Sequence, residues 1–394
     1  MAQFDEAYFQ NNVQRFYADV DQAFRTHGCE KLGSHDIYFR LSRMAAPMIE
    51  YSEIKRICSD VDRLPLEVDE PGGHRRWTYA WGRAAERYKN IAENAELAGY
   101  RRTAGLNFIR ASLLAHAGQL FSRPEWPEKN ILHLERINCY RQGAAYLGIE
   151  EIHIPYETII LPGYLWMPTG INKPAVVIMV PGANSTKEEL HRWADAFVQR
   201  GLAAFYFDGP GQGEKSPLLG CKLPMRLELY HHVLTTVIDH LKNEHGQKLN
   251  MERLALWGQA TGGHLITRAY EHERRPVALV NLDGTPSLKG YPYLPGDLQE
   301  EQRAVYGCQS YEETWAYLEV RGDAMPSAQH IDVPYLIIHG MRNVLAGKDA
   351  MQQLAHAVGD NAELMTFEDG NLGVFNWDTI MTDAMADWLM DKLR

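Results

Sequence analysis

Residues 254–264 read LALWGQATGGH, an apolar stretch that breaks into small residues and then resumes as a helical pattern. Ala260 lies at the tip of the predicted turn, with Gly258 and Gly262 two positions away on either side. Many enzymes hold a nucleophile at the tip of a tight turn between a strand and a helix. Here the tip carries only a methyl group, so the stretch that indicates the fold also raises the question of the chemistry.

Strands and helices alternate on both sides of this turn, from residue 149 to residue 394. EIHIPYETIILPGYLWMP (151–168) predicts a hairpin, and apolar strands follow in PAVVIMV, AAFYF, RLALWGQ, VALVNL, YLIIHG and AELMTF. These strands do not alternate with polar residues, and most are followed by amphipathic helices, so both faces of a mostly parallel sheet are expected to be covered. We therefore predict a doubly wound α/β domain.

Residues 285–330 interrupt this alternation. The segment is rich in Tyr, Gly and Pro and contains one helical stretch, YEETWAYLEV (311–320). Its place after a strand predicts a lid insertion over the carboxyl ends of the strands, with an ordinary surface excursion as the alternative.

Residues 1–148 show a helical pattern throughout, beginning near residue 5. Apolar and aromatic residues recur at steps of three and four within 6–24, 78–100, 102–121 and 128–147. Small residues allow close approach of the later helices, namely Ala84, Ala85, Ala111 and Ala115. The pattern predicts an all-helical N-terminal domain without a fixed repeat.

Composition narrows the class of protein. The chain has 394 residues and a formal net charge of −11, and it lacks a basic stripe, so we expect no nucleic-acid partner. The beginning of the chain lacks a signal-peptide pattern, and no window approaches 18 uninterrupted apolar residues, so we expect a cytoplasmic protein without a membrane partner.

The five cysteines are scattered without CxxC spacing. They are interpreted as reduced rather than as disulfides or a zinc site, and Cys221 is interpreted as a half-buried hydrophobe rather than a reactive thiol. The sequence contains no metal signature and no phosphate-binding fingerprint, so no metal or cofactor is expected.

The strand, G-x-X-x-G turn and helix resemble the nucleophile elbow of the α/β-hydrolases. PGANSTKEEL (181–190), DGPGQGE (208–214) and the helical N-terminal domain narrow the resemblance to the group containing 2,6-dihydroxypseudooxynicotine hydrolase, the fungal polyketide-shortening hydrolases and the FrsA-like esterases. The resemblance covers nearly the whole chain. It implies a serine nucleophile, an orienting carboxylate and a histidine base. Because relatives with this architecture tend to be dimers, the resemblance also implies a homodimer.

Each implied triad position holds an unsuitable residue. Ala260 stands at the nucleophile position, Asn343 at the acid position of HGMRNVLAGKDA (339–350), and Leu372 at the histidine position of FEDGNLGVFNW (367–377). None of these side chains can attack, ionise or accept a proton as the triad requires. Three losses favour a natural, degenerate triad over a single inactivating substitution.

Other residues near the predicted site have two readings each. Asp283 ends a strand and is either a working carboxylate or a structural one, and Asp208 and Glu214 of DGPGQGE are equally open between chemistry and architecture. His264 is interpreted first as a core histidine. The predicted substrate contacts are Asn184, Lys187, Gln259, His264 and Asn376.

The anion-stabilising donors do not depend on side chains. The backbone N–H groups of Thr261, at the start of a helix, and of Ala183, in PGAN, are expected to converge beside Ala260 as an oxyanion hole.

We therefore expect a non-hydrolytic enzyme of natural-product biosynthesis, with a pocket between the elbow, the lid and the helical domain. Its expected substrate is a small carbonyl-rich metabolite, polyketide-like or aromatic, and its expected reaction is C–C bond formation, cyclisation or cleavage. The alternatives are a true hydrolase carrying an engineered Ala260 and a non-catalytic ligand-binding pseudo-hydrolase.

Overall fold

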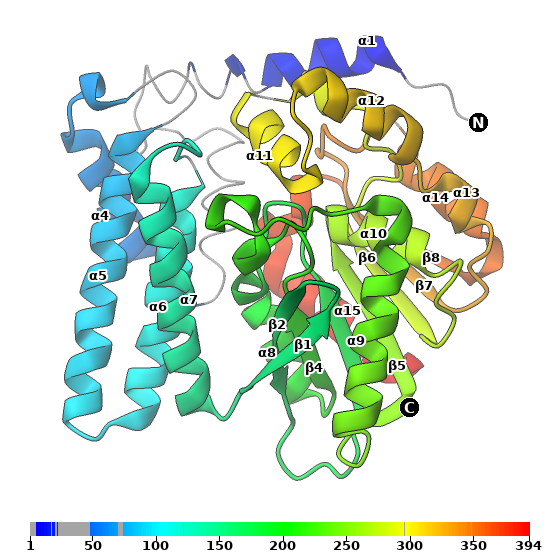
Figure 1. The fold of residues 1–394 in the computed structure, drawn as a ribbon, viewed down its shortest axis with the longest axis horizontal. Helices are drawn as coiled ribbons and strands as arrows, with labels where there is room; N and C mark the ends of the chain where they lie inside the picture. Colours follow the sequence, from blue (N-terminus) through cyan, green and yellow to red (C-terminus); the bar gives the residue numbers. More distant parts are fainter. Residues whose placement is uncertain are drawn as a thin grey trace. The chain divides into compact units, whose positions relative to one another are not determined.

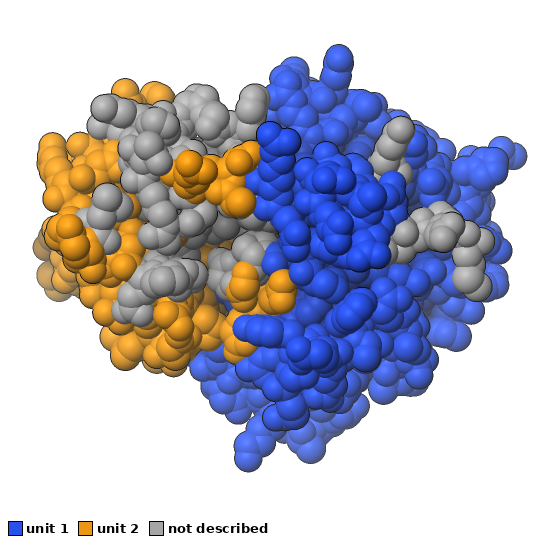
Figure 2. Space-filling view, turned by 90° about the horizontal axis from the view of Figure 1, so that it is seen from above, with its two compact units in different colours: residues 1–15, 152–294, 301–394 blue, residues 16–151, 295–300 orange. Residues whose placement is uncertain are grey.

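The chain forms two compact units, coloured separately in Figure 2. Unit 1 comprises residues 1–15, 152–294 and 301–394, and unit 2 comprises residues 16–151 and 295–300. The computed structural model describes residues 5–16, 18–19, 22, 48–69, 74–120, 122–294, 296–347 and 349–394. Cys29 and parts of the predicted first helix (6–24) lie outside these residues, and the other four cysteines are free thiols.

Among the residues of unit 2 that the structure describes, four long or medium helices are visible as the antiparallel blue and cyan ribbons of Figure 1. They are α4 (Tyr51–Arg63), α5 (Arg75–Leu97), α6 (Arg101–Gln119) and α7 (Pro127–Leu147), with a short 3-10 helix η2 (Leu66–Val68) before α5. α6 and α7 approach so closely that a Cβ on Gly143 would lie 2.8 Å from the carbonyl oxygen of Gly105, so this contact requires glycine. The four alanines predicted to allow close packing are all buried. Gly148, with φ 75°, ends α7 in the left-handed conformation that glycine adopts readily.

Unit 1 is built on one sheet of eight strands, in the order β1-β2-β4-β3-β5-β6-β7-β8 (Figure 1). The strands are β1 (Glu150–Tyr156), β2 (Ile159–Trp166), β3 (Ala175–Val180), β4 (Ala203–Phe207), β5 (Asn250–Gln259), β6 (Ala278–Leu282), β7 (Tyr335–Gly340) and β8 (Ala362–Phe367). β2 pairs antiparallel with β4, and the pairs from β4 through β3 to β8 are parallel. The α/β-hydrolase fold predicted from the sequence is confirmed.

Helices cover both faces of this sheet, as the uniformly buried strands predicted. They are α8 (His191–Gln199), α9 (Tyr230–His245), α10 (Thr261–Ala269), α14 (Ala350–Val358) and α15 (Asp378–Lys392). α9 and α10 pack with β3, β4 and β5 in the main apolar core. On the other face Trp257 of β5 contacts Trp193 of α8, with ring centroids 4.9 Å apart, and donates to Met385 of α15. Short 3-10 helices complete the unit, namely η3 (Lys187–Leu190), η4 (Gly213–Lys215), η5 (Pro217–Leu219), η6 (Leu227–Leu229), η7 (Tyr291–Tyr293), η8 (Gly359–Asn361) and η9 (Leu372–Trp377).

Two expectations about the organisation of the chain need correction. Residues 285–330 contain three helices rather than one, α11 (Gly296–Tyr306), α12 (Tyr311–Arg321) and α13 (Met325–Ala328). The polar run LQEEQ concealed α11, although Gln and Glu are good helix formers. In addition, residues 5–15, expected in the helical domain, pack with unit 1 as α1 (Glu6–Tyr8) and a π-helix η1 (Phe9–Gln14).

The strand order reverses between β3 and β5, which places the carboxyl ends of these strands side by side. In such sheets ligands bind at the crevice where the order reverses. The turn after β5 fits there only because of its glycines: a Cβ on Gly258 would lie 2.3 Å from the carbonyl carbon of Gly262, and a Cβ on Gly262 would lie 2.1 Å from the carbonyl oxygen of Val180. The first and last residues of the G-x-X-x-G motif are thus required by packing.

We predict that Gly262→Ala lowers the free energy of unfolding by about 3 kcal/mol or more, because the added methyl group collides with rigid backbone of β3. Urea unfolding monitored by tryptophan fluorescence measures the loss. Gly296→Ala is the matched control, since a Cβ at Gly296 has no neighbour within 4 Å. Equal stability of the two variants would contradict this account of the turn.

Candidate active site

Ala260 occupies a strained turn between β5 and α10. Its φ of 48° and ψ of −117° lie in a region that residues other than glycine rarely adopt. Its N–H donates to the carbonyl oxygen of Leu282 at 2.9 Å, which fixes the turn to the end of β6. Backbone strain of this kind costs about 1–3 kcal/mol and is found most often at functional sites. The conformation presents the Cβ of Ala260 at the carboxyl edge of the sheet.

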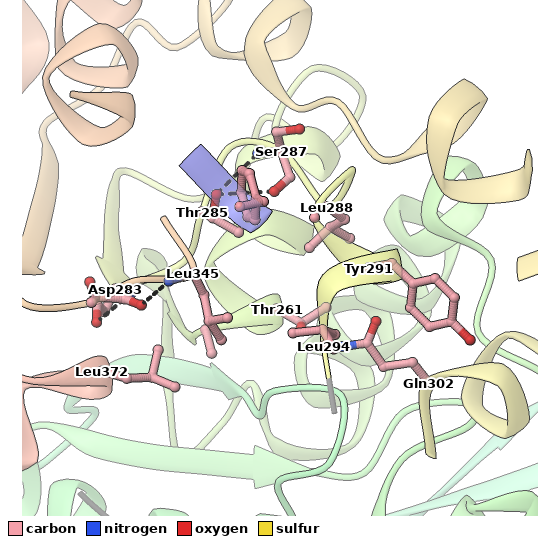
Figure 3. A pocket seen from close by; sticks show the side chains of 14 residues that line it. Thr261, Asp283, Thr285, Ser287, Leu288, Tyr291, Leu294, Gln302, Leu345 and Leu372 are labelled. Atoms are coloured by element: carbon pink, nitrogen blue, oxygen red, sulfur yellow. Dashed lines mark hydrogen bonds between the residues drawn. The ribbon is translucent and has the colours of Figure 1, made fainter. Parts of the chain in front are cut away.

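A pocket of about 540 Å³, partly open to solvent, lies at this edge (Figure 3). All of its lining residues belong to unit 1, and about half come from the segment predicted as a lid. The lining residues are Phe9, Ala260, Thr261, Asp283, Thr285, Ser287, Leu288, Gly290, Tyr291, Leu294, Gln302, Asn343, Leu345 and Leu372.

Two backbone N–H groups near the tip of the turn are the candidates for an anion site. Thr261 is the first residue of α10, and within the described chain neither its N–H nor that of Ala183 donates to another backbone carbonyl. The turn that contains Ala183 is close to the tip, since a Cβ on Gly182 would lie 3.5 Å from the Cβ of Ala260. The start of a helix also favours negative charge. The predicted oxyanion hole of Thr261 and Ala183 stays a prediction, which these positions favour.

Gln212 of DGPGQGE holds the turn that contains Ala183. Its Nε2 donates to the carbonyl oxygens of Pro181 and Gly182 at 2.7 and 3.1 Å. Its Oε1 accepts from the N–H of Gly209 and the hydroxyl of Tyr230. The loop DGPGQGE (208–214) thus has an architectural role. Through Gln212 it positions the turn that carries Ala183, one of the two predicted anion donors.

Asp283 is buried at the end of β6 and accepts four hydrogen bonds. Its Oδ1 accepts from His339 Nδ1 at 2.8 Å and more weakly from the N–H of Gly340 at 3.4 Å. Its Oδ2 accepts from Asn343 Nδ2 at 2.9 Å and from the N–H of Gly373 at 2.6 Å. A carboxylate has about four lone-pair directions, so these donors occupy all of them. Asp283 is arranged to hold three chain segments together rather than to accept a proton from a ligand.

Leu372 extends into the pocket from the loop after β8 (Figure 3). The next two residues, Gly373 and Val374, have φ of 73° and 56°. Positive φ at a β-branched residue is an outlier, and Val374 is fully buried. This strained path aims the N–H of Gly373 at Asp283, so a backbone donor occupies a bond that a histidine side chain of this loop would otherwise make. No histidine lines the described pocket.

The structure brings together five of the residues predicted for the site, Ala260, Thr261, Asp283, Asn343 and Leu372, all of which line the pocket. Ala183 is not among the lining residues, although its neighbour Gly182 lies close to Ala260. The others do not line the pocket either. Asn376 closes a turn through Asn371 and Asp369, Asn184 donates to Glu301 at 3.3 Å, and Gln259 is buried within β5.

His264 is a core residue, as its first interpretation held. It is fully buried, and its Nδ1 donates to the carbonyl oxygen of Thr285 at 3.1 Å. Burial lowers the pKa of His264 to about 3, so the ring is neutral at pH 7. It does not reach the pocket as the predicted substrate contact.

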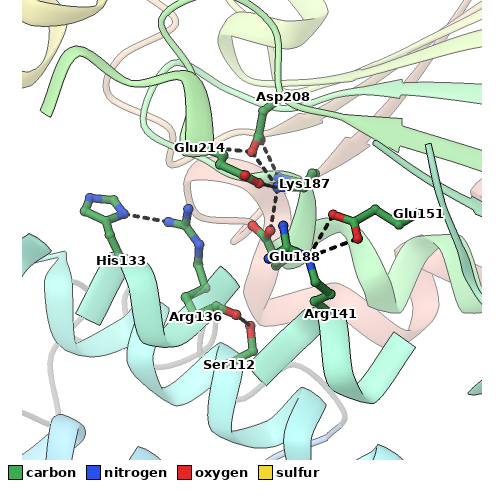
Figure 4. Close-up of polar contacts among 9 residues, drawn as sticks. All are labelled: Ser112, His133, Arg136, Arg141, Glu151, Lys187, Glu188, Asp208 and Glu214. Carbon is green, nitrogen blue, oxygen red and sulfur yellow. Dashed lines mark hydrogen bonds and ion pairs between the residues drawn. The ribbon is translucent and has the colours of Figure 1, made fainter. Parts of the chain in front are cut away.

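Lys187 and Asp208 form a separate buried ion cluster (Figure 4). The ammonium nitrogen of Lys187 lies 2.7 Å from Glu188, 3.0 Å from Asp208 and 2.9 Å from Glu214. Burial alone would lower the pKa of Lys187, but the carboxylates of Asp208, Glu188 and Glu214 outweigh it and hold the pKa well above its usual value. The predicted substrate contact Lys187 and catalytic candidate Asp208 are thus both placed in the interior.

Among the described residues, the carboxylates of Glu188, Asp208 and Glu214 have a spacing that suits a cation, since their oxygens lie within 4.8 Å of one another. The lysine ammonium already occupies the position between them. The sequence gives no signal of this ion pair, because Lys187 and Asp208 belong to separate loops 21 residues apart in the chain.

Three residues of the site were missed from the sequence. His339 belongs to the HG pair that begins the motif of Asn343, but that motif predicts a role only for the fifth position. Gln212 stands within a motif whose glycines drew attention first. Phe9 lies more than 240 residues from the elbow, and no local pattern connects the two.

Comparison with known proteins identifies related sequences. The family model of serine aminopeptidases (S33), a hydrolase family, matches residues 172–285. The chain is 33% identical over 229 residues to 20-hydroxy-prefusarin hydrolase of Gibberella moniliformis. The matched region covers 55% of this chain and 54% of that protein. It is 25% identical over 321 residues to 2,6-dihydropseudooxynicotine hydrolase of Paenarthrobacter nicotinovorans, with 80% and 84% covered. The chain thus spans about half the length of the fungal relative.

Solved structures share the fold. The crystal structure of 2,6-dihydroxy-pseudo-oxynicotine hydrolase superposes with a TM-score of 0.78 at 23% identity, over 90% of this chain and 95% of that one. The structure titled AbyA5 Wildtype gives a TM-score of 0.66 at 14% identity, over 91% and 100%. Among the described helices, none combines the length and apolar character needed to cross a bilayer.

We predict that Asn343→Asp destabilises the protein in a pH-dependent way. The new carboxylate would replace an amide nitrogen that lies 2.9 Å from Asp283. Repulsion would raise the folded-state pKa of one carboxyl above its unfolded value of about 3.9. When the pKa of a carboxyl is higher in the folded than in the unfolded protein, folding is disfavoured at a pH where the unfolded carboxyl is ionised. The free energy of unfolding should therefore fall by about 3 kcal/mol at pH 8, and this loss should shrink toward pH 4, where the carboxyl is largely protonated in both states.

Thermal unfolding between pH 4 and pH 8 measures this difference from the parent. Asn343→Ala is the control, because losing the amide costs about 1–2 kcal/mol at every pH. A pH-independent effect of Asn343→Asp would contradict the proposed arrangement around Asp283.

Proposed function

The chain belongs to the α/β-hydrolase superfamily, and from that premise we propose that it is a non-hydrolytic enzyme whose pocket stabilises an enolate or oxyanion of a small carbonyl-rich metabolite. The observation that carries this proposal is Ala260 itself. The strained backbone that presents a nucleophile in this superfamily is retained, with φ 48°, while the side chain at its tip has no oxygen.

The remaining electrostatic elements support the proposal. The N–H groups of Thr261 and Ala183 are the proposed donors, and Gln212 fixes the turn that carries the second of them through the carbonyl oxygens of Pro181 and Gly182. A donor of this kind contributes about 3–4 kcal/mol to a developing oxyanion in a site that excludes water. Fixed donors act without covalent participation, so charge stabilisation does not require a serine.

Proton transfer by the triad is not supported by the same geometry. Leu372 occupies the loop that would supply a base, and the carboxylate of Asp283 is held by four donors. We therefore favour reactions in which negative charge gathers on a substrate oxygen while a C–C bond forms or breaks within one bound molecule. Cyclisation fits this description, because proximity and charge stabilisation supply most of its rate enhancement.

The lining supports an apolar substrate with a few oxygen atoms. Aliphatic and aromatic side chains surround the pocket, while Thr285, Ser287 and Gln302 offer polar groups at its lid side. 20-hydroxy-prefusarin hydrolase and 2,6-dihydropseudooxynicotine hydrolase are named for oxygenated metabolites, which supports a polyketide-like or aromatic substrate for this chain.

A true hydrolase is the second candidate, because both relatives are named as hydrolases. In that account Ala260 replaces a catalytic serine, and Asp283 works with a histidine outside the described pocket lining. Restoring the hydroxyl separates the two candidates.

We predict that Ala260→Ser does not create an efficient esterase. With no imidazole lining the pocket, the new hydroxyl would remain un-ionised and weakly nucleophilic. The kcat/KM for 4-nitrophenyl acetate should stay within about tenfold of the parent, without a burst of 4-nitrophenol. The double variant Ala260→Ser with Leu372→His is the positive control, and a large rise in hydrolysis from the single change alone would favour the hydrolase.

A further inference from the structure

The N-terminal segment of unit 1 supplies part of the pocket. Residues Glu6–Tyr8 form α1 and Phe9–Gln14 form a π-helix, a rare conformation that is found frequently at functional sites. Asn11 and Asn12 donate from their side chains to the carbonyl oxygens of Ala7 and Tyr8 at 2.9 and 2.8 Å. These bonds satisfy backbone groups of the turn that carries Phe9.

The ring of Phe9 fits a slot formed by a glycine. Phe9 is 6% exposed and lines the pocket together with Ala260. A Cβ on Gly290 would lie 2.2 Å from Cε1 of Phe9, and its three nearest atoms would all belong to this ring. Gly290 has φ −72° and ψ 0°, which any residue can adopt, so the glycine is required by the ring rather than by the backbone.

Two further contacts fix the segment to the lid. The hydroxyl of Tyr293 donates to Glu6 Oε1 at 2.8 Å, and its ring lies 5.9 Å from that of Phe9. Burial and the contact with Glu6 raise the pKa of Tyr293 to about 12, so the phenol remains a donor at neutral pH.

We propose that Phe9 is a specificity-determining residue, whose ring limits the size of the substrate and packs against a flat, conjugated carbonyl compound. The proposal rests on the proposed function, which places the substrate at the elbow. A flat substrate is favoured because Gly290 packs against the Phe9 ring and holds it in place, so that the ring offers the pocket a rigid apolar surface.

Binding of three aryl methyl ketones of increasing size tests the proposal. Acetophenone, 2-acetylnaphthalene and 2-acetylanthracene are titrated into the full chain by calorimetry. Removing the ring in Phe9→Ala should weaken binding of acetophenone about tenfold and strengthen that of 2-acetylanthracene by a similar factor, since the wall that contacts the small ketone excludes the large one.

Gly290→Ala provides an independent variant, because its methyl group displaces the ring of Phe9 without truncating it. It should shift the size preference in the same direction in the parent, and it should add no further shift in the Phe9→Ala background. Gln10→Ala is the matched control: it truncates an exposed side chain of the same segment, which does not line the pocket, and should leave the preference unchanged.

The outcomes separate the two proposals. An unchanged size preference in both Phe9→Ala and Gly290→Ala overturns the role of Phe9 and leaves the proposed function standing. Failure of every ketone to bind the parent and all variants overturns the carbonyl-binding function, and the role of Phe9 with it. Thermal unfolding verifies that each variant is folded.

Discussion

The turn at Ala260 is the constraint on which the rest of the site depends. Its φ of 48° directs the chain from β5 into α10 within one residue and leaves the N–H of Thr261 at the pocket. The turn exists only because Gly258 and Gly262 allow backbone to approach backbone at distances that a side chain forbids. A protein that had lost all use for this edge would be free to relax such strain, and this chain retains it.

Asp283 shows how the edge is organised without a proton relay. The carboxylate ties β6 to His339 and Asn343 at the end of β7 and to Gly373 in the loop after β8. The hydrogen bonds that a catalytic histidine at the pocket would need are therefore made by the amide of Asn343, by backbone and by His339, whose ring does not line the pocket. What remains at the pocket is a set of fixed dipoles facing an apolar cavity, and such a set acts on charge rather than by covalent attack.

Much of the fold could be predicted from the sequence because its signals are local. Apolar strands without alternation identified the covered parallel sheet, and G-Q-A-T-G located the elbow and the first residue of α10. Asn343 and Leu372 were located by motif position and do line the pocket. Local signals cannot report partners, however. The ion cluster of Lys187 with Asp208 and the four donors of Asp283 join segments far apart in the chain, so their chemistry was visible only in three dimensions.

Phe9 illustrates the same limit most clearly. Its sequence neighbourhood predicts a helix of the N-terminal domain, whereas its ring reaches the pocket through the slot at Gly290. The helix α11 was missed for a different reason, since a polar helix on a lid has little apolar periodicity to detect. The pocket's shape thus depends on contacts that no window of sequence contains.

Ionisation of a phenol bound in the pocket tests the central claim most directly. The absorbance of 4-nitrophenolate reports the ionised fraction of 4-nitrophenol as pH is varied with saturating protein. If Thr261 and Ala183 form an anion site, the bound phenol should have a pKa lower by about one unit or more than in water, since each unit corresponds to about 1.4 kcal/mol of preference for the anion. An apolar cavity without such donors would raise that pKa, and a raised value would contradict the account.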